Sequence, residues 1–265
     1  MDNLIDDVLR NIDKSKDSDR QLSNIWLFVY FAPIISSIVT IGFAIISVLS
    51  VVSTSYPFIS LNEYNDLEIF SESAYILILF LISILIFFVV NLLLTYELIK
   101  RRNLHFARQN LLFNNLILDL DSLVENKSIK EETNFPNDNK ILNELNVKEN
   151  RKDPILWAVL SAFLPIISWY VNYFLMKDFY NHERREEIFW ANLVSMLKSF
   201  DINFAVPPRT EIISKRSFEL YLILTIITCG LFGIFWIHIL LRDPNEHFKY
   251  HIKIENVLKS SINSI

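Results

Sequence analysis

The residues most able to do chemistry are five histidines, of which His247 and His251 lie closest together in the sequence. Residues four apart share one face of a helix, so both imidazoles could bind one metal ion, with Glu246 and Glu255 as further ligands. The sequence lacks the H-E-x-x-H spacing of zinc proteases. The simpler interpretation is a pair of imidazoles on a helix at a membrane surface. We therefore assign no metal, no cofactor and no catalytic residue, and expect that the protein is not an enzyme.

Three histidines lie in similar segments. The clearest copies are YELIKRRNLHFARQNLLFNNL (96–116) and YFLMKDFYNHERREEIFWANL (173–193), and a looser copy, HILLRDPNEHFKYHIKIENVL, begins at His238. At a constant offset, Tyr96, Lys100, His105, Arg108, Asn115 and Leu116 match Tyr173, Lys177, His182, Arg185, Asn192 and Leu193. Each copy follows an apolar stretch. Such repetition indicates one structural unit that is used several times.

Basic residues gather around two of these histidines. His105 precedes Arg108 by three residues, and His182 precedes Arg185 by the same spacing. Basic side chains just inside a membrane favour anionic lipid head groups. The predicted head-group site comprises Lys100, Arg101, Arg102, His105, Arg108, Lys177, His182 and Arg185. The alternative is that these residues make helix-packing contacts specific to the repeat, or ordinary anchoring contacts at the membrane surface.

Four stretches contain no charged side chain: 25–53, 73–96, 155–176 and 220–241. At 1.5 Å per residue, each is long enough to cross about 30 Å of hydrocarbon. We predict an all-α, polytopic membrane protein with four hydrophobic helical segments and cytoplasmic amphipathic helices. Proline and glycine weaken helices. The predicted helix-break positions are Pro33, Pro165, Gly230 and Gly233.

The charge distribution bears on membrane topology. Residues 54–72 contain no Lys or Arg, whereas a basic cluster begins at Lys100, so the positive-inside rule places both termini and residues 100–153 in the cytoplasm. If the third and fourth stretches both span the membrane, residues 178–216 lie outside the cell. If both are re-entrant hairpins, that segment is cytoplasmic. Its positive charges, and the similarity of 177–193 to 100–116, favour re-entrant hairpins. The length of about 22 residues favours full spans, in which proline and glycine are common, so both topologies stay open.

The chain divides into five predicted parts. These are an acidic amphipathic helix (1–20), a first hydrophobic hairpin with its amphipathic helix (21–118), a polar cytoplasmic linker with a short helix near 140–147 (119–153), a second repeat unit (154–200) and a third (201–265). Because the polar face of the first helix is acidic, we expect it to pack against the protein itself or a neighbouring subunit.

Residues 225–247 (TIITCGLFGIFWIHILLRDPNEH) resemble an uncharacterised prokaryotic family of repeat-containing membrane domains. The shared pattern is an apolar run with a Cys-Gly or Phe-Gly break, aromatic residues around a second glycine, and then an Asp-x-Asn-x-x motif. The matching positions are Cys229, Gly230, Gly233, Trp236, Asp243, Asn245 and His247. The unit at 155–197 matches more weakly, because Pro165 replaces the glycines. The resemblance implies a membrane repeat and no particular activity.

Several functional classes are disfavoured. No charged residue occurs inside the four apolar stretches, which counts against an active transporter or pump. A formal net charge of −5 without a basic stripe counts against nucleic-acid binding. We predict a non-enzymatic, multi-pass scaffold of the cell membrane that binds lipids, forms homo-oligomers and organises or curves the bilayer.

Two other functions stay open at this point. The first alternative is an oligomeric channel or passive solute facilitator, for which the polar candidates are Asn91, Ser168, Asn172 and Thr228. The second is an enzyme that acts on lipids, for which His182, His247 and His251 are the candidate catalytic residues.

Overall fold

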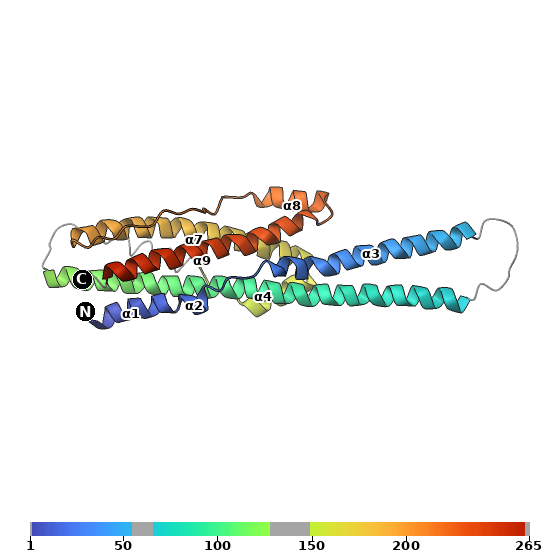
Figure 1. The fold of residues 1–265 in the computed structure, drawn as a ribbon, viewed down its shortest axis with the longest axis horizontal. Helices are drawn as coiled ribbons and strands as arrows, with labels where there is room; N and C mark the ends of the chain where they lie inside the picture. The colour runs from blue at the N-terminus through green and yellow to red at the C-terminus, as the bar shows by residue number, and fades with distance from the viewer. Residues whose placement is uncertain (1, 55–65, 128–148, 263–265) are drawn as a thin grey trace.

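The computed structural model of the protein describes residues 2–54, 66–127 and 149–262, and all regular structure in these ranges is α-helical. This confirms the predicted all-α class. The helices are α1 (Asp2–Asp13), α2 (Ser15–Ser18), α3 (Ile25–Thr54), α4 (Asp66–Lys127), α6 (Pro154–Phe163), α7 (Pro165–Ser199), α8 (Phe218–Ile227) and α9 (Phe232–Ile262). Together they form an elongated bundle, and α4 extends along most of its length (Figure 1).

Helices α3 and α4 form a long antiparallel hairpin. The rings of Tyr30 and Phe87 lie 5.5 Å apart, and the hydroxyl oxygens of Ser36 and Ser83 lie 2.9 Å apart. Both helices contain runs long and apolar enough to cross a membrane. Contrary to the expectation of a break, α3 continues through Pro33. A proline removes only one backbone bond, and the surrounding turns of a 30-residue helix hold it in place.

Helices α6 and α7 form a second, shorter hairpin, which reverses direction at Leu164. Asn91 of α4 donates a hydrogen bond to the carbonyl oxygen of Ser161 near the end of α6, at 3.2 Å. The break expected at Pro165 is present, and this proline is the first residue of α7. At that position its missing N–H removes no helical hydrogen bond, and its fixed φ suits the start of a helix.

Helices α8 and α9 form the third hairpin. The ring of Tyr221 in α8 lies 5.3 Å from that of Phe232 at the start of α9. In the turn between them, Cys229 and Gly230 have φ values of 50° and 93°. Glycine adopts such positive values without steric cost, which accounts for the break at Gly230. Gly233, by contrast, lies just inside α9 and does not interrupt it.

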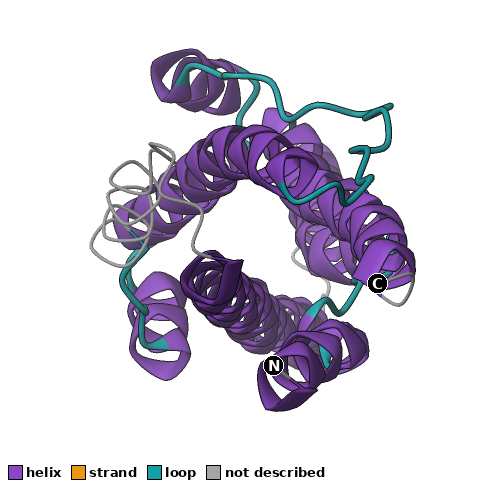
Figure 2. Ribbon diagram, turned by 90° about the vertical axis from the view of Figure 1, so that its left-hand side faces the viewer, coloured by secondary structure: helices purple, strands orange, loops and turns teal. Residues whose placement is uncertain are grey.

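Beyond the three hairpins, α4, α7 and α9 continue side by side in the same direction, as Figures 1 and 2 show. Their shared core contains residues from matching positions of the three similar segments. They are Leu112 and Leu116 of α4, Phe189 and Leu193 of α7, and Ile254 and Leu258 of α9. Val8 and Ile12 of α1 join the same core, so the N-terminal helix packs against the protein itself, which is one of the two expected arrangements.

Helix α4 extends to Lys127, beyond the predicted linker boundary at residue 118. Buried Leu116, Ile117 and Leu120 belong to the core that contains α1, and this packing stabilises the additional turns. The rest of the predicted linker, including the short helix near 140–147, lies outside the described residues, as does most of the acidic segment 54–72.

Candidate metal centre

Three histidines meet at the centre of the bundle, between α4, α7 and α9. His105, His182 and His247, here called the histidine triad, occupy the same position in the three similar segments. All three are fully buried. Their ring centroids lie 5.0 to 5.5 Å from one another. The sequence offset therefore corresponds to a real meeting point in space.

The pattern of apolar residues explains this convergence. On each of the three helices, a large apolar side chain follows the histidine by seven residues and another by eleven. These spacings lie on one face of an α-helix. Because both apolar residues belong to the shared core, packing turns each histidine toward the other two helices.

On its outer side, each triad histidine contacts a buried carboxylate through Nδ1. The carboxylate partners of His105, His182 and His247 are Asp19, Glu149 and Glu183, at 2.9, 2.8 and 3.4 Å. They come from different parts of the chain: the residue after α2, the segment before α6, and α7 itself. Since a carboxylate accepts hydrogen bonds, each Nδ1 is the donor.

An arginine pairs with each of these three carboxylates. Arg108 lies 2.6 Å from the first, and Arg185 pairs with the second. Both follow their histidine by three residues on the same helix. The third copy has Tyr250 at that position, and Arg209 from the segment between α7 and α8 pairs with Glu183 instead. The guanidinium of Arg209 lies 4.0 Å from the centre of the Tyr250 ring, so the tyrosine positions the substitute arginine.

On the inner side, the Nε2 atoms of the triad point toward one another and toward Glu186. The Nε2 atoms of His105 and His247 are 3.0 Å apart. Glu186 Oε1 lies 2.7 Å from His182 Nε2, and Oε2 lies 3.4 Å from His247 Nε2. The four candidate ligand atoms lie within 4.8 Å of one another.

A second polar layer lies four residues further along each helix, where Gln109, Glu186 and His251 occupy equivalent positions. His251 Nε2 is 2.8 Å from Glu186 Oε2. Gln109 donates hydrogen bonds to His251 Nδ1 at 2.6 Å and to Glu255 at 2.8 Å. Within this layer, Gln109 therefore orients His251, and His251 holds the Glu186 carboxylate in position beside the triad.

The surroundings shift the pKa values of the triad histidines in different directions. Burial lowers the pKa of His247 to about 4, so this imidazole is neutral at pH 7. Burial would also lower the pKa of His182, but Glu186 and Glu149 overcome it and raise the pKa to about 9. For Glu186, burial would raise the pKa, yet His182 and His251 hold it well below the usual value. Glu186 is therefore ionised inside the protein.

The structure divides the eight residues predicted to bind lipid head groups. Five of them are buried: Arg101, Arg102, His105, Arg108 and His182. Each makes at least one polar contact with another protein group, as the 2.8 Å pair between Arg102 and Asp178 illustrates. Arg185 is half-buried beside Glu149, whereas Lys100 and Lys177 lie outside the cluster. Lipid binding by these residues stays a prediction, and helix packing explains the buried members.

Sequence reasoning missed four acidic members of the cluster, which are Asp19, Glu149, Glu183 and Glu186. For Glu186 a signal existed, because the alignment of the three segments places it level with Gln109 and His251. All three are polar and come directly before the apolar part of the same helix face. The other three acidic residues have no such pattern, because their roles depend on how distant segments pack.

The motif residues of segment 225–247 also make contacts in the bundle. The Asn245 side chain accepts a hydrogen bond from the backbone N–H of Leu22 at 3.0 Å and donates one to its carbonyl at 2.8 Å. Asp243 pairs with Arg216. These contacts attach the segment before α3 and the segment before α8 to α9.

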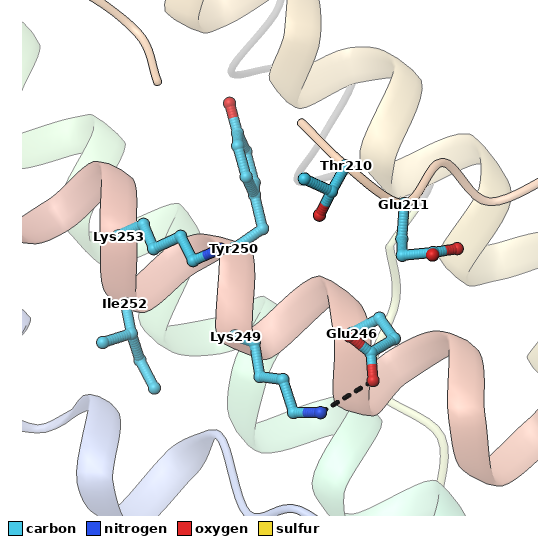
Figure 3. A pocket seen from close by; sticks show the side chains of 7 residues that line it. All are labelled: Thr210, Glu211, Glu246, Lys249, Tyr250, Ile252 and Lys253. Carbon is cyan, nitrogen blue, oxygen red and sulfur yellow. Dashed lines mark hydrogen bonds and ion pairs between the residues drawn. The ribbon is translucent and has the colours of Figure 1, made fainter. Parts of the chain in front are cut away.

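Two surface grooves lie apart from the buried histidine centre. The first lies along α9 (Figure 3), has a volume of about 300 Å³, and is open; its Lys249 and Glu246 pair with each other at 2.7 Å. The second, of about 580 Å³, lies between α4 and the segment before α6 and includes Lys100 and Arg102. A cavity beside His247 holds only about 10 Å³, room for no more than about one water molecule. Nothing in these cavities favours substrate access to the triad.

No protein-family model, curated protein or solved structure matches the chain. The resemblance of residues 225–247 to a family of membrane repeats therefore stays a prediction. In the part of the chain that it describes, the structure defines an all-helical arrangement with two long and two shorter apolar helices and a buried histidine centre.

Proposed function

We propose that the protein is a membrane scaffold in which the long α3/α4 hairpin crosses the bilayer while the two short hairpins enter only one leaflet. The observation that carries this proposal is the position of the α6/α7 tip. There the ring of Phe163 lies 4.9 Å from that of Phe88 in α4. The tip thus lies level with the interior of the apolar stretch of α4 and not with its far end.

The depth follows from helix geometry. Phe88 precedes Tyr96, the end of the apolar stretch, by eight residues, which corresponds to about 12 Å along the helix. The hydrocarbon core of a bilayer is about 30 Å thick, so the tip would reach somewhat short of its middle. Helices α6 and α8 each contain 10 residues, or about 15 Å of helix. Neither is long enough to cross a bilayer.

The half of the bundle that contains the three hairpins is here called the hairpin half. Its surface is also suited to contact with lipid. Side chains such as Phe28, Ile166 and Ile227 are 75%, 73% and 71% exposed. Of the 18 most apolar consecutive residues, only 6% are buried in α3 and 17% in α4. The core helix of a soluble protein would instead be covered by other protein segments. Exposed apolar area of this extent favours contact with lipid tails.

The packing of α4, α7 and α9 favours re-entrant hairpins over four spans. His182 lies against His105, and the ring of Phe189 is 3.9 Å from that of Phe113. Residues 177–199 therefore share one bundle with residues 100–127, which is compatible only with the same side of a membrane. With the positive-inside rule, that side is the cytoplasm, and both termini lie there as well.

Such an arrangement would distort a bilayer. The leaflet on the side of the polar bundle would contain all three hairpins, whereas the other leaflet would contain α3 and α4 alone. Unequal insertion expands one leaflet more than the other, so the bilayer would bend toward the far side. Self-association of the exposed apolar faces would concentrate this effect, and homo-oligomerisation is part of the proposal.

Side-specific labelling tests the topology. Ser214→Cys, on an exposed position between α7 and α8, is introduced in a Cys229→Ala background, and intact cells are treated with a membrane-impermeant maleimide. We expect labelling only after lysis. Ser60→Cys, in the acidic segment, is the reference and should be labelled in intact cells. Labelling of Ser214→Cys in intact cells would exclude re-entrant hairpins and make the channel the better hypothesis.

A vesicle assay tests the effect on the bilayer. Purified protein is reconstituted at increasing protein-to-lipid ratio, and vesicle shape is measured by electron cryomicroscopy. We expect smaller or tubular vesicles. Ile166→Lys, at the α6/α7 tip, should reduce the bending, whereas Ile188→Lys, at an exposed position of the polar half, should preserve it. Unchanged spherical vesicles at high protein load would contradict the scaffold, and a sized conductance would instead support the channel.

A further inference from the structure

We infer that the histidine triad and Glu186 bind one divalent transition-metal ion, with Zn²⁺ as the expected ion. This inference is independent of the proposed membrane function, because the site lies in the polar half of the bundle and depends only on contacts among α4, α7 and α9. A metal ion there would cross-link the three helices through side chains that come from each of them.

The first argument is the orientation of two imidazoles. His105 and His247 both donate from Nδ1 to a carboxylate, so the Nε2 atom of each carries a lone pair. These two Nε2 atoms face each other at a distance of 3.0 Å in a region without solvent access. Two acceptors that close repel unless a proton or a metal ion lies between them. A metal ion converts this repulsion into two coordinate bonds.

The second argument concerns two buried atoms of α7. His182 Nε2 and Glu186 Oε1 are 2.7 Å apart, yet neither has an aligned hydrogen-bond partner within the described residues. Their separation of four residues on one helix brings them together without the angle that a hydrogen bond needs. Buried polar atoms that lack a partner are costly. Both become good ligand atoms when the metal displaces the proton of His182 Nε2, and both face His105 and His247.

The third argument is the support around the triad. Metal-binding histidines characteristically donate their other ring N–H to a carboxylate or carbonyl, which fixes the tautomer and the ring orientation. Here all three do so, and all three carboxylates are in turn paired with an arginine. The fourth candidate ligand, Glu186, is supported by His251, whose Nε2 atom contacts its carboxylate. A structural ion-pair network needs no such convergence of three Nε2 atoms on one point.

The ligand types select the ion. Three imidazole nitrogens disfavour Mg²⁺ and Ca²⁺, which prefer oxygen ligands, and the absence of sulfur in the set disfavours Cu⁺. Zinc accepts histidine and carboxylate ligands in a tetrahedron with bonds of about 2.0–2.2 Å, which separates ligand atoms by about 3.3 Å. The observed separations, all within 4.8 Å, require small inward shifts only. Four protein ligands and no adjoining substrate cavity correspond to a structural zinc site.

The experiment uses the full-length chain in mild detergent. Protein expressed with added Zn²⁺ is analysed for bound metal by mass spectrometry of the elements, then stripped with a chelator and titrated with Co²⁺. We expect about one metal ion per chain and the intense visible absorption of tetrahedral Co²⁺ with nitrogen and oxygen ligands. Adding Zn²⁺ should raise the thermal midpoint of the stripped protein, because the ion binds the folded state. Mg²⁺ should not.

Two variants separate this site from adventitious binding. His247→Gln removes a ligand while it preserves volume, and should weaken Zn²⁺ binding at least 100-fold, since even supporting residues contribute 10- to 100-fold. His238→Gln, on the same helix but outside the cluster, should bind as the unaltered protein does. Equal binding by His247→Gln would overturn the inference.

A test on the unaltered protein remains decisive if His247→Gln does not fold. Substoichiometric metal, together with a featureless Co²⁺ spectrum and no thermal shift with Zn²⁺, would show that the cluster is a metal-free ion-pair network. Neither result depends on how the hairpins lie in a membrane, so the labelling assay and the metal assay can fail separately.

Discussion

The two halves of this bundle have opposite arrangements of polar and apolar side chains, although α4, α7 and α9 pass through both. In the hairpin half, apolar side chains point outward, and Ile166 is 73% exposed. The polar half, which contains the histidine triad, is here called the histidine half. There charged side chains point inward, and Arg102 is 1% exposed. The comparison teaches that the histidine half supplies its own polar partners, whereas the hairpin half depends on its surroundings to cover its surface.

The interactions that hold the halves together differ in the same way. Across the described part of the long hairpin, the bond between Ser36 and Ser83 joins two uncharged side chains. The histidine half contains a continuous network in which an unpaired charge would be buried if one member were removed. Single substitutions should therefore have very unequal effects in the two halves, and four tests follow in order of decreasing effect.

The largest effect is expected for Arg108→Met. Arg108 lies 2.6 Å from Asp19 and 2.8 Å from Glu255, and all three are buried. Removal of one partner from a buried ion pair typically destabilises a protein by about 3–5 kcal/mol. Two carboxylates would lose their arginine here, while contacts such as those from His105 and Gln109 remain. Because both carboxylates are affected at once, the effect should reach the upper end of this range. The measurement is denaturant-induced unfolding in detergent, followed by circular dichroism.

The matched control is Arg10→Met on α1. Arg10 also pairs with a carboxylate, that of Asp7, but its side chain is 65% exposed. Exposed pairs contribute about 0–1 kcal/mol. Similar losses for the two variants would show that burial of the network is not what makes the histidine half sensitive.

The second test truncates one phenylalanine in each half. Phe113 is fully buried and stacks on Phe189 with ring centroids 3.9 Å apart. Phe113→Ala should lower the unfolding free energy by about 3–5 kcal/mol, because it removes apolar contacts and leaves a cavity. Phe43→Ala, at a position of α3 that is 63% exposed, should change it by less than about 0.5 kcal/mol in detergent. A large loss for Phe43→Ala would mean that its exposed face contacts another copy of the protein.

The sequence predicts much of this architecture. The three similar segments, read at a constant offset, place His105 and His182 at equivalent positions. Packing between the repeated helices is the alternative to lipid binding that the sequence leaves open for these residues. Helix periodicity indicates α1, and the apolar runs indicate the hairpins. Pro165 and Gly230 mark the two turns for stereochemical reasons that are local, namely the missing N–H of proline and the positive φ that glycine adopts.

The rest of the centre depends on tertiary contacts that no local pattern encodes. Asp19 is one of several acidic residues near the N-terminus and reaches His105 only because α1 and α2 pack along α4. Arg209 lies in a segment without regular structure, and its role emerges only when that segment crosses α9. At Pro33 the local pattern predicts a break that is absent. Proline has a strong local tendency to break helices, yet α3 continues through it.

The third test concerns the turn between α8 and α9. Gly230 has a φ of 93°, and a Cβ there would meet open space. Gly230→Ala should therefore act through the backbone alone and destabilise by about 1–2 kcal/mol. Gly233 lies inside α9, also with open space around it, so Gly233→Ala should be neutral or stabilise by up to about 1 kcal/mol. Opposite signs in thermal unfolding would verify the turn, and a shared sign would contradict it.

The smallest effect is expected for the hydrogen bond between α3 and α4. Ser83 is buried, pairs with Ser36 at 2.9 Å and also donates to the carbonyl of Leu79 at 3.0 Å. In a lipid environment, such interhelical bonds contribute about 0.6 kcal/mol on average, because the separated helices find other partners. A double-mutant cycle with Ser36→Ala and Ser83→Ala should give a coupling of this size. A coupling above about 1.5 kcal/mol would show that polar contacts hold the hairpin half as firmly as the histidine half, and the contrast between the two halves would fail.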